Sequence, residues 1–149
     1  MSELDDLYQE IILDHNRRPR NFRAMENSTH SAEGHNPLCG DEVTVFLHLN
    51  GETIEDVSFN GQGCAISKAS ASLMTARLKG KTLTEVRGIV DQVRSLLTAT
   101  VEPDPDLEQL GDIAALSGVR KFAVRVKCAT LPWHTLEAAL EGRAEVSTE

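Results

Sequence analysis

Residues 42–59 read EVTVFLHLNGETIEDVSF, two alternating runs of apolar and polar side chains on either side of Asn50-Gly51. Alternation with a period of two is typical of a strand with one buried and one exposed face. Asn and Gly both tolerate positive φ, so Asn50-Gly51 supplies the residues of a tight hairpin turn. The stretch therefore predicts an antiparallel hairpin, with one strand over 42–49 and its return over 53–59.

Helical patterns flank this hairpin, and most of them follow it. Apolar residues recur three and four positions apart in segment 2–17, and Pro19 ends that pattern. Thr82 and Glu85 have the spacing of a capping box at the start of another helix. Pro132 is tolerable only in the first turn of a last helix. The expected helices cover 2–17, 67–79, 82–97, 106–116 and 129–141.

The order of these elements predicts the fold class. Strands cluster in the first half of the chain and helices in the second, which disfavours alternating βαβ units. Segment 19–38 is polar and shows no strand by its pattern, and 118–127 reads as a connector. We expect an α+β fold, with an antiparallel three-stranded sheet covered on one face by helices. The chain suits a single domain over 1–149, with 142–149 as a frayed tail.

The chain has 149 residues and a formal net charge of −8. An acidic chain has no electrostatic reason to bind nucleic acid, and no apolar run approaches the roughly 20 residues that cross a bilayer. No basic start precedes an apolar stretch, so we expect a cytoplasmic protein. Two basic clusters are either solvated faces or docking surfaces for an acidic partner. They comprise Arg17, Arg18, Arg20 and Arg23, and Arg120, Lys121, Arg125 and Lys127.

The three cysteines lie at expected breaks in the structure. Cys39 precedes the first hairpin strand, Cys64 follows the second, and Cys128 is expected at the start of the last helix. An odd number of cysteines in a cytosolic chain argues against a disulfide framework. A helix N-terminus favours a thiolate at Cys64 and Cys128, and Arg125 and Lys127 add positive charge near Cys128.

Three thiolates leave one position open in a tetrahedral zinc site. Asp41 lies two residues from Cys39 across a glycine and is the natural fourth ligand. His35 and His134 compete with it on chemical type. The chain has no Cys-x-x-Cys pair, so three separately buried cysteines are the alternative interpretation of the spacing alone.

The short sequence segments around the three cysteines resemble, in order, the three cysteine motifs of the IscU/NifU-type cluster-assembly family. They are NPLCGD at 36–41, GQGCAIS at 61–67 followed by ASAS at 69–72, and KCATLPW at 127–133. Asp14-His15 in the N-terminal helix also fits this family. The resemblance runs from about residue 4 to 141, and it implies an IscU/SufU-like fold.

Features of the chain resemble the SufU branch of this family more than its scaffold branch. Scaffold members carry a histidine immediately before the third cysteine, where this chain has Lys127. Segment 121–127 stands where they carry a Leu-Pro-Pro-Val-Lys stretch, and extra chain lies over 104–119. SufU-type proteins are zinc-binding sulfur acceptors that work with a SufS-type cysteine desulfurase.

Carried over residue by residue, the resemblance implies a catalytic Cys39 that accepts sulfur. It implies further iron–sulfur assembly proteins as downstream partners, and Arg125 and Lys127 are candidates for steering the partner or the persulfide. Two alternatives stay open: a scaffold that holds a [2Fe–2S] cluster on the same thiolates, and a purely structural zinc domain. The implied zinc ligands are Cys39, Asp41, Cys64 and Cys128.

Overall fold

The computed structural model describes residues 3–37, 40–98 and 110–147, and its centre is the predicted hairpin. Strand β2 (Asp41–Asn50) pairs antiparallel with β3 (Thr53–Gln62), which confirms the prediction. Gly51 in the turn has a φ of 63°, a conformation that glycine adopts without steric cost. The alternation also holds, because Val43, Val45 and Leu47 are buried on one face.

The prediction of a three-stranded antiparallel sheet was wrong, because the sheet has four strands and is mixed. Its order is β3-β2-β1-β4. Strand β1 (His30–Asn36) pairs antiparallel with β2, whereas β4 (Glu145–Ser147) pairs parallel with β1. Residues 145–147 were expected in a frayed tail. The chain returns to β1 instead, where the Glu33 N–H donates to the Ala144 carbonyl at 2.8 Å.

The sequence did not predict strand β1, because small and polar residues occupy the positions that face the core, where large apolar residues usually alternate. Ala32, Gly34 and Asn36 point inward, so the strand has no run of large apolar residues. Gly34 is needed there, since a Cβ at this position would lie 2.0 Å from Thr135 Oγ1. The backbone of β1 therefore packs closely against α5 at Gly34, where a strand usually presents a large apolar side chain.

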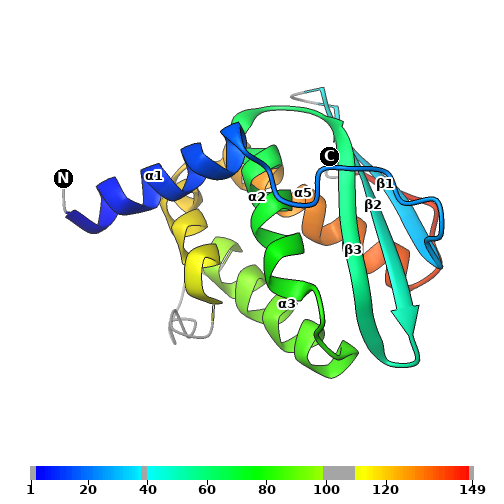
Figure 1. The fold of residues 1–149 in the computed structure, drawn as a ribbon. Coiled ribbons are helices and arrows are strands. Elements are labelled where there is room, and N and C mark those ends of the chain that lie inside the picture. The colour runs from blue at the N-terminus through cyan, green and yellow to red at the C-terminus, as the bar shows by residue number, and fades with distance from the viewer. Residues whose placement is uncertain (1–2, 38–39, 99–109, 148–149) are drawn as a thin grey trace.

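The helices gather on one side of the sheet, as predicted, and enclose the core with it (Figure 1). The Thr82–Glu85 capping box is confirmed, because Glu85 Oε1 accepts from the Thr82 N–H at 3.1 Å and the Glu85 N–H donates to Thr82 Oγ1 at 3.2 Å. No helix within the described ranges combines the length and apolar character that spanning a membrane requires. The helices are α1 (Glu3–Arg17), α2 (Ala65–Leu78), α3 (Leu83–Thr98), the 3₁₀ helix η1 (Gly111–Lys121) and α5 (Ala123–Leu140).

The last helix begins earlier than expected. Residues 118–127 were predicted as a connector, but they end η1 and begin α5. Residues 106–109 of the helix expected over 106–116 lie outside the described residues, and 111–116 fall in η1. Pro132 is accommodated inside α5 rather than in its first turn. A proline there removes one N–H donor and disturbs the preceding turn.

A side-chain network from α2 supports the disturbed turn of α5. Ser70 Oγ donates to the Ala129 carbonyl at 2.6 Å, and Trp133 Nε1 donates to Ser70 Oγ at 3.1 Å. These contacts satisfy polar groups that are buried between the two helices. Because α5 begins at Ala123, Cys128 lies in its second turn and not at its N-terminus.

Candidate metal centre

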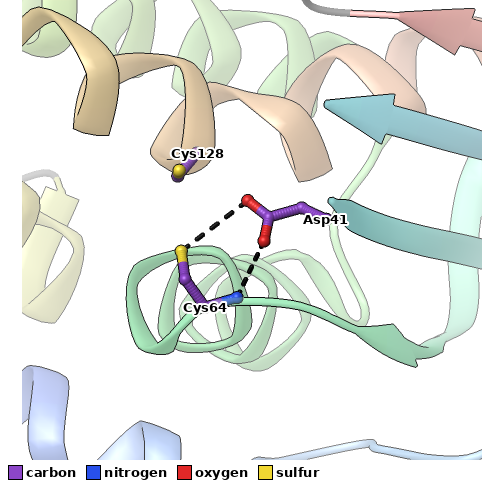
Figure 2. A group of neighbouring side chains, drawn as sticks. All are labelled: Asp41, Cys64 and Cys128. Atoms are coloured by element: carbon purple, nitrogen blue, oxygen red, sulfur yellow. Dashed lines mark hydrogen bonds between the residues drawn. The ribbon is translucent and has the colours of Figure 1, made fainter. Parts of the chain in front are cut away.

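Asp41 is the first residue of β2, and its carboxylate is buried with only 1% of the residue exposed. Its Oδ1 accepts from the Cys64 backbone N–H at 2.8 Å, and its Oδ2 lies 3.6 Å from Cys64 Sγ. Figure 2 shows the carboxylate between the start of α2 and the side of α5. None of the ion pairs in the described part of the chain includes Asp41, so its negative charge faces sulfur rather than a basic side chain.

Cys64 caps the N-terminus of α2, close to where the sequence placed it. Its backbone is extended, and its Sγ accepts from the Ser67 N–H at 3.4 Å. An N-cap group meets the unpaired N–H groups and the positive end of the helix dipole, which together favour a thiolate. The side chain is half-buried. Cys64 is therefore positioned both to cap a helix and to bind a cation.

Cys128 is fully buried, and its surroundings differ from those predicted. Because it lies in the second turn of α5, the helix N-terminus does not act on it as expected. Its thiol lies 3.7 Å from the Val124 carbonyl, which can accept a hydrogen bond from it. Asn36 Nδ2 donates to its sulfur at 3.7 Å. Arg125 is exposed and Lys127 half-buried on the same helix, and their steering role stays a prediction.

The three side chains converge from separate elements. One ligand atom from each of Asp41, Cys64 and Cys128 lies within 4.8 Å of the other two, and Figure 2 shows them facing a common point. Two sulfurs and one carboxylate oxygen form a donor set that suits zinc. A buried carboxylate beside two thiols is costly without a cation, so the residues present fit a metal ion.

The fourth expected ligand, Cys39, lies outside the described residues. Its neighbours set where it can act, because Asn36 and Asp41 are partners in the β1–β2 register and Cys39 falls between them. The Gly40 N–H donates to the Asn36 carbonyl at 2.9 Å, and Gly40 has a φ of 71°. The described residues on either side of 38–39 therefore lie close to the candidate metal centre.

The competing histidines do not join this group among the described residues. His35 Nδ1 lies 4.0 Å from Glu42 Oε1, and 40% of its side chain is exposed. Burial lowers the pKa of His134, which lies six residues after Cys128 on α5. His35 instead forms a separate group with Glu33 and Glu145 on the solvent side of β1 and β4.

Two residues of the site were missed by the sequence analysis. Asn36 was quoted only as part of a motif, although its amide contacts Cys128. Gly63 leaves room for the carboxylate, since a Cβ there would lie 2.7 Å from Asp41 Oδ1. The glycine-rich run before Cys64 was a usable signal, because glycine permits close backbone approach.

Comparison with known proteins agrees with this arrangement. The family model described as the NifU-like N-terminal domain matches residues 7–129. The zinc-dependent sulfurtransferase SufU of Bacillus subtilis strain 168 is 43% identical over 136 residues, which cover 91% of this chain and 90% of that protein. The iron–sulfur cluster assembly scaffold protein IscU of Streptococcus pyogenes serotype M1 is 33% identical over 144 residues, or 97% and 89% of the two chains.

A solved structure shares the fold over nearly its whole length. It is a crystal structure of a proposed iron–sulfur cluster assembly scaffold protein for the SUF system from Fervidobacterium islandicum AW-1. The TM-score is 0.83 at 36% sequence identity, and the match covers 94% of this chain and 99% of that one.

Proposed function

The chain belongs to the family of NifU-like N-terminal domains, and from this premise we propose that it is a zinc-dependent sulfurtransferase of iron–sulfur cluster biogenesis. It accepts persulfide sulfur from a SufS-type cysteine desulfurase and passes it to downstream assembly proteins. The observation that carries the proposal is the convergence of Asp41, Cys64 and Cys128 within 4.8 Å. The similarity to a SufU protein named as a zinc-dependent sulfurtransferase supports it.

Cys39, Asp41, Cys64 and Cys128 hold the zinc ion in this proposal. When bound, zinc keeps thiol ligands deprotonated at neutral pH, which is the chemistry that sulfur transfer needs. Asp41 contributes the oxygen ligand, and its hydrogen bond from the Cys64 N–H orients the carboxylate. Arg125 and Lys127 lie on α5 close to Cys128 in sequence, and in this proposal their positive charge steers the partner toward the site.

Cys39 is the sulfur acceptor. Cys128 is buried in α5 and Cys64 caps α2, so both are poorly placed to reach a second protein. The Cys39 thiolate attacks the outer sulfur of the desulfurase cysteine persulfide. A new S–S bond forms on Cys39, and the old S–S bond breaks, with its electron pair leaving on the desulfurase cysteine as a thiolate. The transferred sulfur keeps its proton, so the products are a Cys39 persulfide and a free desulfurase thiolate.

A scaffold function is the second candidate, and the similarity to a scaffold protein favours it. The same thiolates can ligate iron, because thiolate ligands suit both zinc and iron–sulfur clusters. Lys127 argues against it, since a lysine offers no cluster ligand where scaffold relatives place a histidine. A cluster would colour the purified protein, whereas a zinc site is colourless.

The deciding experiment is a desulfurase assay with a SufS-type enzyme. We expect the wild-type protein to contain about one zinc ion, to accelerate alanine release and to gain one persulfide. The Cys39→Ser variant should lose both the acceleration and the persulfide. The control variant Arg87→Gln changes an exposed side chain of α3 and should behave as the wild type. Persulfide formation by Cys39→Ser would contradict the assignment.

A further inference from the structure

Asn36 occupies an unusual position at the end of β1. It is fully buried, and its side chain reaches across to α5, where Nδ2 donates to Cys128 Sγ at 3.7 Å. Its Oδ1 is buried without a hydrogen-bond partner in the described part of the chain. Burying an amide oxygen without a partner is unfavourable, so packing alone gives no reason for an asparagine here.

The sulfur that Asn36 contacts needs a donor. Cys128 is fully buried in the second turn of α5, away from the helix N-terminus. The Val124 carbonyl, 3.7 Å from the sulfur, suits a protonated thiol but repels a thiolate. A metal-bound thiolate can only accept hydrogen bonds, and the Asn36 Nδ2–H donates one to this sulfur.

The backbone of Asn36 also contacts Gly40, the residue that follows Cys39 in the sequence. Its backbone carbonyl accepts from the Gly40 N–H at 2.9 Å, and it is the register partner of Asp41. One residue therefore connects the strand that precedes Cys39, the carboxylate ligand and the buried sulfur.

We infer that Asn36 is a positioning residue of the metal centre, which orients Cys128 as a thiolate ligand and fixes its distance from Asp41. The inference rests on the proposed zinc site. Groups of this kind change metal affinity when they are removed, even though they do not touch the metal.

The test compares zinc affinities of purified proteins by competition with a chromophoric chelator. Asn36→Leu keeps the branched shape and the number of heavy atoms of the side chain, and it removes both the donor and the orphaned oxygen. We expect zinc binding to weaken by about 10-fold to 100-fold. The melting temperature of the zinc-free variant should equal or exceed that of the wild type, because an unpaired buried group has been removed.

Thr135→Val is the matched control. Thr135 is buried at the same interface between β1 and α5 and donates to the Leu131 carbonyl at 2.7 Å, away from the sulfur. Its zinc affinity should equal that of the wild type. Cobalt(II) substitution gives a second measurement, since loss of Cys128 from the coordination shell lowers the thiolate-to-cobalt absorbance by about one third.

Each of these measurements either supports or overturns the inference that Asn36 positions the metal ligands. Unchanged zinc affinity in Asn36→Leu, or an equal loss in Thr135→Val, would overturn the inference and leave the zinc site standing. A wild-type protein that binds no zinc would overturn the proposed function and this inference with it. If Asn36→Leu does not fold, Asn36→Asp replaces it. Asn36→Asp places an acceptor against the thiolate, so we expect weaker zinc binding, and unchanged affinity would overturn the inference.

Discussion

Gly63 shows how closely the chain approaches itself at the candidate metal centre. The Asp41 carboxylate reaches the Cys64 N–H across the space in which a Gly63 side chain would lie. The absence of a Cβ therefore determines where the carboxylate can be. The glycine contributes no ligand and no charge, and its effect on the site is entirely steric.

The Gly63→Ala variant should bind zinc about 10-fold more weakly, because the added methyl group displaces the carboxylate and its hydrogen bond. Gly88→Ala is the control, since a Cβ at Gly88 meets nothing within 4 Å. That variant should keep its zinc affinity and gain up to about 1 kcal/mol of helix stability. Chelator competition and thermal melts measure both quantities. Equal zinc affinity in the Gly63→Ala variant would contradict the steric account.

At the scale of elements, α5 depends on α2. Ser70 on α2 connects the Trp133 indole with the Ala129 carbonyl, in the turn disturbed by Pro132. The same turn begins with Cys128. The network therefore links packing between two helices to the position of a candidate metal ligand.

Removing this hydroxyl should destabilise the protein. We expect Ser70→Ala to lower the free energy of unfolding by about 2 kcal/mol, because it leaves the Trp133 indole N–H buried without a partner and removes the side-chain hydrogen bond to the Ala129 carbonyl. Ser58→Ala is the contrasting variant. Ser58 Oγ is buried and has no partner among the described residues, so its removal should change stability little. Urea denaturation of both proteins gives the comparison, and equal losses would rule out the network.

The sequence predicted those elements whose local patterns are strong. The hairpin followed from alternation and Asn50-Gly51, and the start of α3 followed from Thr82 and Glu85. Strand β1 was hidden because Gly34 and Asn36 face inward and only the packing of α5 explains them. Strand β4 depends on a long-range parallel pairing, which three residues of local sequence do not encode.

The sequence indicated which side chains meet at the candidate metal centre, but not what surrounds them. Cysteine and aspartate side chains at element boundaries pointed to Asp41 and Cys64, and the structure brings both together with Cys128. The predicted environment of Cys128 was wrong, because α5 begins at Ala123 and contains Pro132 in its interior, so Cys128 does not lie at the helix start. The role of Asn36 depends on contacts between distant segments, which no local pattern reveals.

At the scale of the whole molecule, one buried and one half-buried histidine make stability depend on pH. His15 is buried against α2, with Nδ1 2.7 Å from Ser72 Oγ, and burial lowers its pKa. Burial lowers the pKa of His134 as well. A pKa lower in the folded state than in the unfolded state means that the unfolded chain binds protons first as the pH falls. Stability is therefore full above the ordinary histidine pKa and is lost below it.

The zinc-free protein should lose stability between about pH 7.5 and pH 5.5, the range around the unfolded histidine pKa. His15→Asn keeps an amide near Ser72 and removes the titration, so its unfolding free energy should fall less over this range. A His15→Asn/His134→Asn double variant should fall least. Urea titrations at each pH provide the measurement, and identical slopes in all three proteins would exclude this linkage.

The central claim is that three sulfurs and one carboxylate from distant parts of the chain share one ion. X-ray absorption at the zinc edge of the purified wild-type protein tests it most directly. The account predicts a four-coordinate shell with three sulfurs at about 2.3 Å and one oxygen at about 2.0 Å. A zinc shell without sulfur, or a protein that retains no zinc, would contradict it.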